Sequence, residues 1–135
     1  MSQAHATPQD AEDAYYDALE AGDLQQVMAA WEDSDEISCL LPMQGLAQGR
    51  TAVRAVFEPL LQGRGVALSV KHLQWLEGSE LAIHLVEEAT APPPGRPAVP
   101  VYATNVYRRG AAGWFLLTHQ NAPTPPPPGM TAPPR

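Results

Sequence analysis

The amino-acid sequence predicts an α+β domain in which a curved antiparallel sheet wraps over N-terminal helices and encloses a conical cavity. The first part of the chain carries apolar residues at helical spacing, in two segments separated by one glycine. The second half carries four segments of alternating β-branched and aromatic residues, joined by turns or by a proline-rich loop. The predicted order is ααβαββββ, and helices segregated on one face of an antiparallel sheet define this fold class.

Two helices joined by a tight turn are predicted at the N-terminal end. Thr7 can cap a helix whose first turn contains Pro8, and the apolar spacing then continues to Gly22. Glycine is typical just after the last residue of a helix, where the backbone takes the left-handed conformation. Asp23 can cap the second helix, whose apolar face ends at Trp31.

A strand and a third helix are predicted in the middle of the chain. Ser34 to Leu41 alternate as a strand, and the following loop has room for a very short strand at Leu46-Ala47. Arg50 to Leu61 have helical spacing, and Pro59 should bend or fray the last turn because it has no N–H to donate.

Four long strands are predicted after the third helix. The first places Val66, Leu68 and Val70 on one face, with Leu73 and Trp75 on the other. Such two-sided apolar character predicts a homodimer through the outer face of the sheet. The expected strands are Val66 to Leu76, Leu81 to Ala89, Val99 to Tyr107 and Trp114 to Asn121, with the last two joined by a turn over residues 108–113.

The length of 135 residues predicts one domain. We expect residues 1–7 to be a flexible N-terminus, residues 8–123 to form the domain, and residues 124–135 to be a proline-rich tail.

Charge and cysteine content exclude several classes of partner. The net charge of −7 and the single lysine, Lys71, argue against a nucleic-acid partner, which needs clustered basic residues. No apolar run is long enough to predict a membrane span, and no signal peptide is predicted. With Cys39 as the single cysteine, these features predict a cytoplasmic protein.

The chain resembles the nuclear transport factor 2-like superfamily, and within it the small bacterial SnoaL-like branch. The resemblance implies a cystatin-like roll, on which isomerases, cyclases, hydrolases, dehydratases and noncatalytic modules all occur. It is carried by Tyr15 to Asp23, Trp31 to Asp35, Gly45 to Arg50, Ala103 to Tyr107 and Gly113 to His119.

This sequence departs from the family pattern at three points. Leu41 precedes Pro42 where relatives commonly have a histidine, and His119 stands alone where relatives often have two or three adjacent histidines. No aspartate follows Asp35, so a ketosteroid-isomerase-like aspartate base has no candidate residue.

His119 is the candidate catalytic residue, because imidazole can act as acid or base near neutral pH. A histidine that bonds a neighbouring strand or lies in a dimer contact is the alternative. Asn105 and Asn121 are candidate ligand-binding residues through their amides. Tyr15 and Trp31 are candidates for the pocket wall, with plain core packing as the alternative.

No metal and no cofactor are predicted. His84 and Glu88 are four residues apart, which on a strand is roughly 13 Å, so they cannot share an ion. One of Glu87 and Glu88 must face inward, and an arginine at 108 or 109 is a plausible partner for it. Cys39 is expected to be a buried structural thiol.

Three functions follow from this reasoning. The first is binding of a small apolar molecule in a mainly apolar pocket. The second is an isomerase, cyclase or hydrolase that uses His119 as general acid or base. The third is a homodimerisation module whose cavity is filled by its own side chains.

Overall fold

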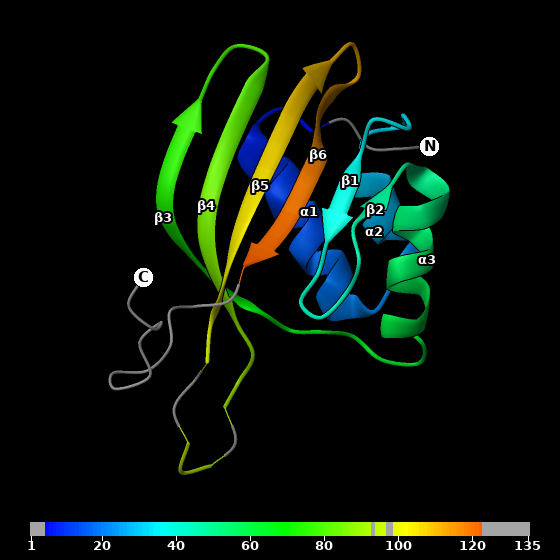
Figure 1. Ribbon diagram of the computed structural model, residues 1–135. Helices are drawn as coiled ribbons and strands as arrows, with labels where there is room; N and C mark the ends of the chain where they lie inside the picture. The colour runs from blue at the N-terminus through cyan, green and yellow to red at the C-terminus, as the bar shows by residue number, and fades with distance from the viewer. Residues whose placement is uncertain (1–4, 93, 97–98, 123–135) are drawn as a thin grey trace, which may run out of the picture.

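The computed structural model describes residues 5–92, 94–96 and 99–122, and it confirms the α+β class (Figure 1). One curved sheet carries the helices on its concave side, with α1 lying across the face formed by β5 and β6. The predicted proline-rich tail lies outside the described residues.

The predicted helix pair is confirmed. Helix α1 (Pro8–Ala21) begins after Thr7, whose Oγ1 accepts a hydrogen bond of 3.1 Å from the N–H of Asp10. It ends at Gly22, which has a φ of 69°. Helix α2 (Leu24–Ala30) begins at Asp23, whose side chain accepts from the N–H of Gln26. These caps satisfy backbone N–H groups that the first turn leaves without partners.

The six strands lie in the order β2-β1-β6-β5-β4-β3. The four long strands form the predicted antiparallel meander, but two features differ from the prediction. The short β2, which lies one residue beyond the very short strand considered at Leu46-Ala47, changes the order to ααββαββββ. Strand β1 runs parallel to β6, so the sheet is mixed. The bounds are β1 (Ser38–Leu40), β2 (Ala47–Gln48), β3 (Ser69–Glu77), β4 (Leu81–Ala89), β5 (Val101–Gly110) and β6 (Gly113–Ala122).

The parallel pairing follows from the route of the chain after α2. Trp31 already forms a parallel bridge with Leu116 of β6, and the N–H of Glu32 donates to the Leu116 carbonyl at 2.9 Å. The chain therefore reaches β1 travelling in the same direction as β6. Strand β1 is shorter than predicted because Ser34 forms a local turn, accepting from the N–H of Glu36.

The turn between β5 and β6 is tighter than predicted. The two strands continue to Gly110 and restart at Gly113, leaving only Ala111 and Ala112 between them. Arg108 belongs to the strand, and its guanidinium binds Glu32 through hydrogen bonds of 2.8 and 2.6 Å.

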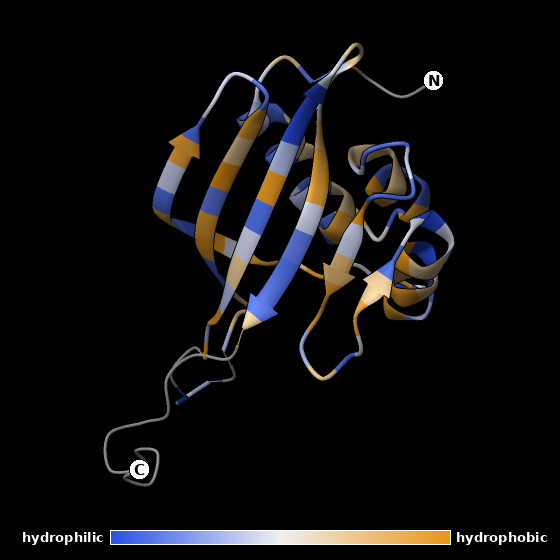
Figure 2. Cartoon of the chain, turned by 45° about the horizontal axis from the view of Figure 1, so that its top comes forward, coloured by the Kyte–Doolittle hydropathy of each residue, from blue (hydrophilic) through white to orange (hydrophobic). Residues whose placement is uncertain are grey.

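Strand β3 contains a bulge that changes which residues face the helices. His72 lies opposite Val86, whereas Trp75 lies opposite His84, so Leu73 is the extra residue. The predicted regular alternation is therefore wrong after His72, and Trp75 shares the concave face with it. Along β4, buried residues alternate with more exposed ones, and Ala82, His84, Val86 and Glu88 are the buried set. Hydrophilic and hydrophobic bands follow one another along β5 (Figure 2).

The core is centred on three aromatic side chains. Tyr15 packs edge-to-face on both Trp31 and Phe57, with ring centroids 6.1 Å apart in each pair. Helix α3 (Arg50–Leu60) is joined to the end of α2 by the Arg50 guanidinium, which donates to the Met28 and Glu32 carbonyls. The helix ends at Leu60, one residue before the predicted end at Leu61, with Pro59 in its last turn. No helix in the described ranges is long and apolar enough to cross a membrane.

Replacing Gly65 with alanine should destabilise the fold by about 2–4 kcal/mol. A Cβ at this position would lie 1.9 Å from the backbone carbonyl oxygen of Glu20, so the end of α1 would have to move. Chemical denaturation measures the change, with Gly45→Ala as the control because a Cβ there meets nothing within 4 Å. Equal effects of the two substitutions would contradict this packing.

Candidate functional site

Polar side chains cross the concave face of the sheet in a single row. In the strand register, Trp75 of β3 lies opposite His84 of β4, which lies opposite Asn105 of β5. Asn105 lies opposite His119 of β6, and His119 is the partner of Cys39 on β1. His84, Asn105, His119 and Cys39 are buried, and burial of the three polar side chains indicates that they are held by specific partners.

His119 contacts an asparagine at each ring nitrogen. Its Nδ1 lies 2.5 Å from Oδ1 of Asn105, and its Nε2 lies 3.0 Å from Oδ1 of Asn121. The Asn121 amide donates from Nδ2 to Glu88 Oε1 and to the Tyr102 carbonyl. Its Oδ1 therefore faces the imidazole and accepts from the Nε2–H group.

Glu88 is the inward-facing member of the Glu87-Glu88 pair, and its side chain is only 5% exposed. Besides Asn121, it accepts a hydrogen bond of 2.6 Å from the Tyr16 hydroxyl, which in turn accepts from Asn105 Nδ2 at 2.9 Å. Burial and the neighbouring carboxylate raise the pKa of Tyr16, so the hydroxyl keeps its proton. These contacts form a ring of polar side chains through His119, whose two nitrogens face amide oxygens and both donate when the imidazole is protonated.

The prediction that an arginine at 108 or 109 pairs with the Glu88 carboxylate is wrong. Arg108 instead pairs with Glu32 and Glu36, near the C-terminal end of β5. Because β5 and β4 are antiparallel, Arg108 lies opposite Leu81 and far from Glu88, which pairs with Val101.

Opposing influences act on the His119 imidazole. Burial lowers its pKa, because the imidazolium loses its hydration, while the Glu88 carboxylate and the Asn121 hydrogen bond act in the opposite direction. The Nε2 atom lies 3.7 Å from Glu88 Oε2. His119 is therefore a buried imidazole beside a carboxylate, an environment of the kind found at acid–base sites.

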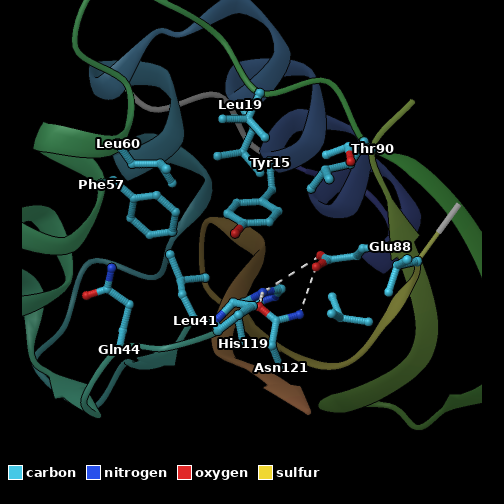
Figure 3. Close-up of a pocket in the computed structure, with 15 residues that line it drawn as sticks. Tyr15, Leu19, Leu41, Gln44, Phe57, Leu60, Glu88, Thr90, His119 and Asn121 are labelled. Atoms are coloured by element: carbon cyan, nitrogen blue, oxygen red, sulfur yellow. Dashed lines mark hydrogen bonds and ion pairs between the residues drawn. The ribbon is translucent and has the colours of Figure 1, made fainter. Parts of the chain in front are cut away.

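A cavity of about 270 Å³ opens beside this ring (Figure 3). Glu88, His119 and Asn121 form its polar end, where the concave face meets α1 and α3. The rest of the wall is mostly apolar and includes Tyr15, Leu19, Leu41, Pro42, Phe57, Leu60, Val66, Leu68, Val99 and Val101.

The structure brings together four of the five residues that the sequence singled out. Tyr15, His119 and Asn121 line the cavity, and Asn105 lies behind His119 as its hydrogen-bond partner. Trp31 is buried in the aromatic core behind Tyr15 and is not part of the wall of this cavity. Sequence reasoning missed Tyr16 as a partner of Glu88, because the contact depends on how α1 lies on the sheet.

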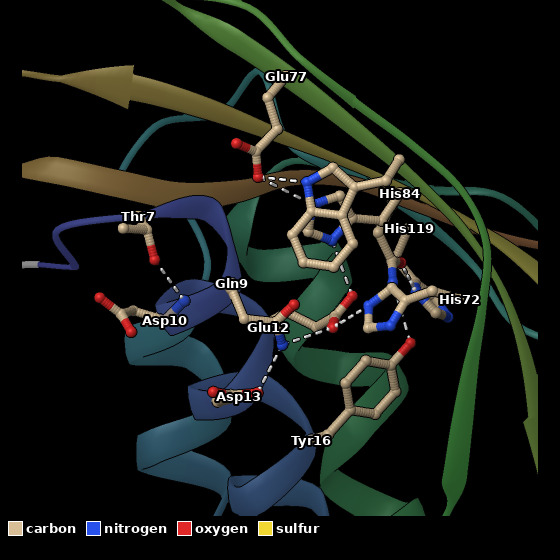
Figure 4. A network of polar contacts seen from close by, with 12 residues as sticks. Thr7, Gln9, Asp10, Glu12, Asp13, Tyr16, His72, Glu77, His84 and His119 are labelled. Carbon is tan, nitrogen blue, oxygen red and sulfur yellow. Dashed lines mark hydrogen bonds and ion pairs between the residues drawn. The ribbon is translucent and has the colours of Figure 1, made fainter.

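A second polar cluster lies further towards the N-terminus of α1 (Figure 4). Glu12, only 2% exposed, accepts contacts from His84 Nδ1 at 2.9 Å and His72 Nε2 at 2.7 Å. Burial acts to raise the pKa of Glu12, but hydrogen bonds from His84 and Gln9 and the charge of His72 outweigh it and lower the pKa. Spacing along one strand could not reveal this cluster, because its members come from three elements.

The comparisons with known proteins agree with this architecture. The model of the SnoaL-like domain matches residues 9–124. The chain belongs to the SnoaL-like domain family. A search of curated proteins finds no match.

Solved structures with the same fold include a candidate calcium/calmodulin-dependent protein kinase type II association domain from Thiobacillus denitrificans. It is 32% identical to this SnoaL-like chain with a TM-score of 0.82, over 90% of this chain and 98% of that one. A candidate dehydratase of the NTF2-like family from Streptomyces avermitilis is 24% identical, with a TM-score of 0.69, over 84% and 91% of the two chains. A ketosteroid isomerase-like protein from Erwinia carotovora atroseptica is 15% identical, with a TM-score of 0.67, over 87% and 94%. The last two show the fold alone.

Cys39 should be unreactive in the folded protein. It is a buried free thiol, as the sequence predicted, and burial together with Glu88 raises its pKa to about 12. At pH 8.5 the Cys39 thiol of the folded chain is therefore protonated. In the unfolded chain the thiol has a pKa of about 8.5, so about half of the molecules have lost that proton. The contribution of Cys39 to the free energy of unfolding is therefore fully present below pH 8.5 and falls as the pH rises above it.

Ellman's reagent at pH 8.5 tests this expectation. Labelling should be at least 100-fold slower in native buffer than in guanidinium chloride, with Cys39→Ser giving the background. Equal rates in the two conditions would show that the thiol is accessible.

Proposed function

We propose that this protein binds a small, uncharged and mainly apolar molecule that carries one hydroxyl or N–H group. The observation that carries the proposal is the cavity of about 270 Å³, with apolar walls and a polar end at Glu88, Asn121 and His119. Small-molecule sites combine mostly hydrophobic walls with a few polar groups that fix orientation.

The polar end favours a hydrogen-bond donor on the ligand. The Glu88 carboxylate already accepts from Tyr16 and Asn121, and a carboxylate has further acceptor capacity. A ligand hydroxyl can use that capacity. A ligand carboxylate would instead meet a like charge in a site of low dielectric constant, where repulsion is strong.

An acid–base enzyme is the second candidate function. The close approach of His119 and Glu88, with opposing influences on the imidazole, supports proton transfer to or from a bound molecule. Glu88 then takes the place of the aspartate that the sequence lacks after Asp35. The candidate dehydratase and the ketosteroid isomerase-like protein support this only at the level of shared fold.

We also propose that two copies of the chain associate through the convex face of the sheet. Leu76 and Ile83 are opposite each other on that face, and Leu81 extends the exposed apolar strip along β4. The helices cover only the concave face, so a second copy is the occupant that the sheet accommodates by symmetry. The 32% identical relative from Thiobacillus is named as an association domain, which is consistent with assembly.

Benzyl alcohol should bind, and benzoate should bind at least tenfold more weakly. The two probes share a ring and differ in whether the polar group is a hydroxyl or a carboxylate. Chemical-shift changes in ¹H–¹⁵N spectra measure both affinities. Val101→Phe adds a ring to the cavity wall and should abolish binding, whereas Ala111→Phe in the exposed β5–β6 turn should not.

Three outcomes would overturn the ligand proposal. They are no detectable binding of benzyl alcohol, equal affinities for benzyl alcohol and benzoate, or unchanged binding of benzyl alcohol by the Val101→Phe variant. Absence of binding together with a stable dimer would favour the dimerisation module.

Replacing Ile83 with glutamate should convert the dimer to a monomer, because burying two charges at a symmetric contact costs several kcal/mol. Light scattering with size-exclusion chromatography measures the mass. Met43→Glu, on the exposed loop after β1, is the matched control and should stay dimeric. A monomeric wild-type protein would contradict the proposed interface.

A further inference from the structure

We propose that Glu12, His72 and His84 form a binding site for one divalent transition-metal ion, with Zn²⁺ as the best-suited ion. The proposal is independent of the ligand proposed for the cavity, because none of these three residues lines that cavity. Two imidazoles and one carboxylate are a donor set that Zn²⁺ accepts, with a water as fourth ligand.

The three side chains already lie at coordinating separation. One ligand atom from each residue can be chosen so that all three lie within 4.8 Å of one another. Glu12 Oε2 is 2.7 Å from His72 Nε2, and Glu12 Oε1 is 2.9 Å from His84 Nδ1. Donors around a tetrahedral Zn²⁺ are roughly 3.3–3.6 Å apart, so side-chain shifts of about 1 Å are enough to admit the ion.

The strand register aligns the two histidines, and the β3 bulge adds Trp75 to them. His72 lies opposite Val86 and so diagonally across from His84 on the concave side. In a regular strand Trp75 would point away from the face that carries His72, and the extra residue at Leu73 brings it to that face. Bulges that re-aim a side chain are frequent at functional sites.

Side chains around the three proposed ligands orient them, as the neighbours of metal ligands do in metal sites. Gln9 Nε2 donates to Glu12 Oε2 at 2.9 Å and so fixes the carboxylate. His84 Nε2 is buried without a hydrogen-bond partner in the described structure, and Glu77 Oε1 is 3.8 Å away. Without an ion, His84 donates from Nδ1 to Glu12. Ion binding would place the proton on Nε2, directed at Glu77, and free the Nδ1 lone pair for the ion, the arrangement in which a carboxylate orients a metal-bound histidine.

The cluster is reachable from solvent on one side. The His72 side chain is 32% exposed, whereas Glu12 and His84 are almost wholly buried. Trp75 covers both imidazoles, with ring centroids 4.6 Å from His72 and 4.2 Å from His84. The ion would therefore enter past His72 and keep a position for water, while the other ligands stay fixed.

Calorimetric titration of the EDTA-treated full chain with Zn²⁺ tests the site. One ion should bind per chain, and Glu12→Gln and His72→Gln should each weaken binding at least tenfold. Two matched controls remove the same groups elsewhere. Asp17→Asn removes an exposed carboxylate further along α1, and His5→Gln removes an imidazole outside the cluster, so both should keep wild-type affinity.

Far-ultraviolet circular dichroism confirms that each variant is folded before it is titrated. The proposal is overturned if wild type shows no saturable binding. It is also overturned if the ligand variants bind as well as wild type, or if the controls lose as much affinity as the ligand variants.

Discussion

Two carboxylates are buried between α1 and the concave face of the sheet, and much of the interior is arranged around them. An ionised carboxylate in the interior is costly unless other groups replace its hydration. Glu12 reaches this position from the helix and finds its partners on β3 and β4. Glu88 reaches it from β4 and finds partners on the helix and on β6. Each carboxylate therefore ties the helix to the sheet, in addition to the apolar packing around Tyr15.

The two clusters occupy different parts of one concave surface. The row of paired positions from Trp75 through His84 and Asn105 to His119 passes from the Glu12 cluster to the Glu88 cluster. Their surroundings differ. Glu12 lies beneath a partly exposed histidine, whereas Glu88 lies at the end of an apolar cavity. A cation and a small apolar molecule would thus be accommodated at separate places on the same face.

The sequence was a good guide wherever a local pattern decided the structure. Capping residues and apolar spacing predicted both N-terminal helices and the extent of β4, because these signals act within a few residues. It was a poor guide to register. The bulge at Leu73 places Trp75 on the concave face instead of the predicted opposite face. No residue type in that segment predicts a bulge.

The same limit applies to the candidate site. His119 and Asn121 are two apart on one strand, so their shared face could be predicted. Asn105 could be named, but its position directly opposite His119 required the sheet register. Glu12 and Tyr16 lie on a helix distant in sequence from every histidine they influence, so only the packing of α1 could reveal their roles.

The most direct test uses the ring-nitrogen NMR resonances of the histidines, which report on both sites in one sample of ¹⁵N-labelled protein. Benzyl alcohol should shift the resonances of His119 and leave those of His72 and His84 in place. Zn²⁺ should then shift His72 and His84 and leave His119 in place. Unchanged His119 resonances in the presence of the alcohol would contradict the proposal that the polar end of the cavity receives a ligand.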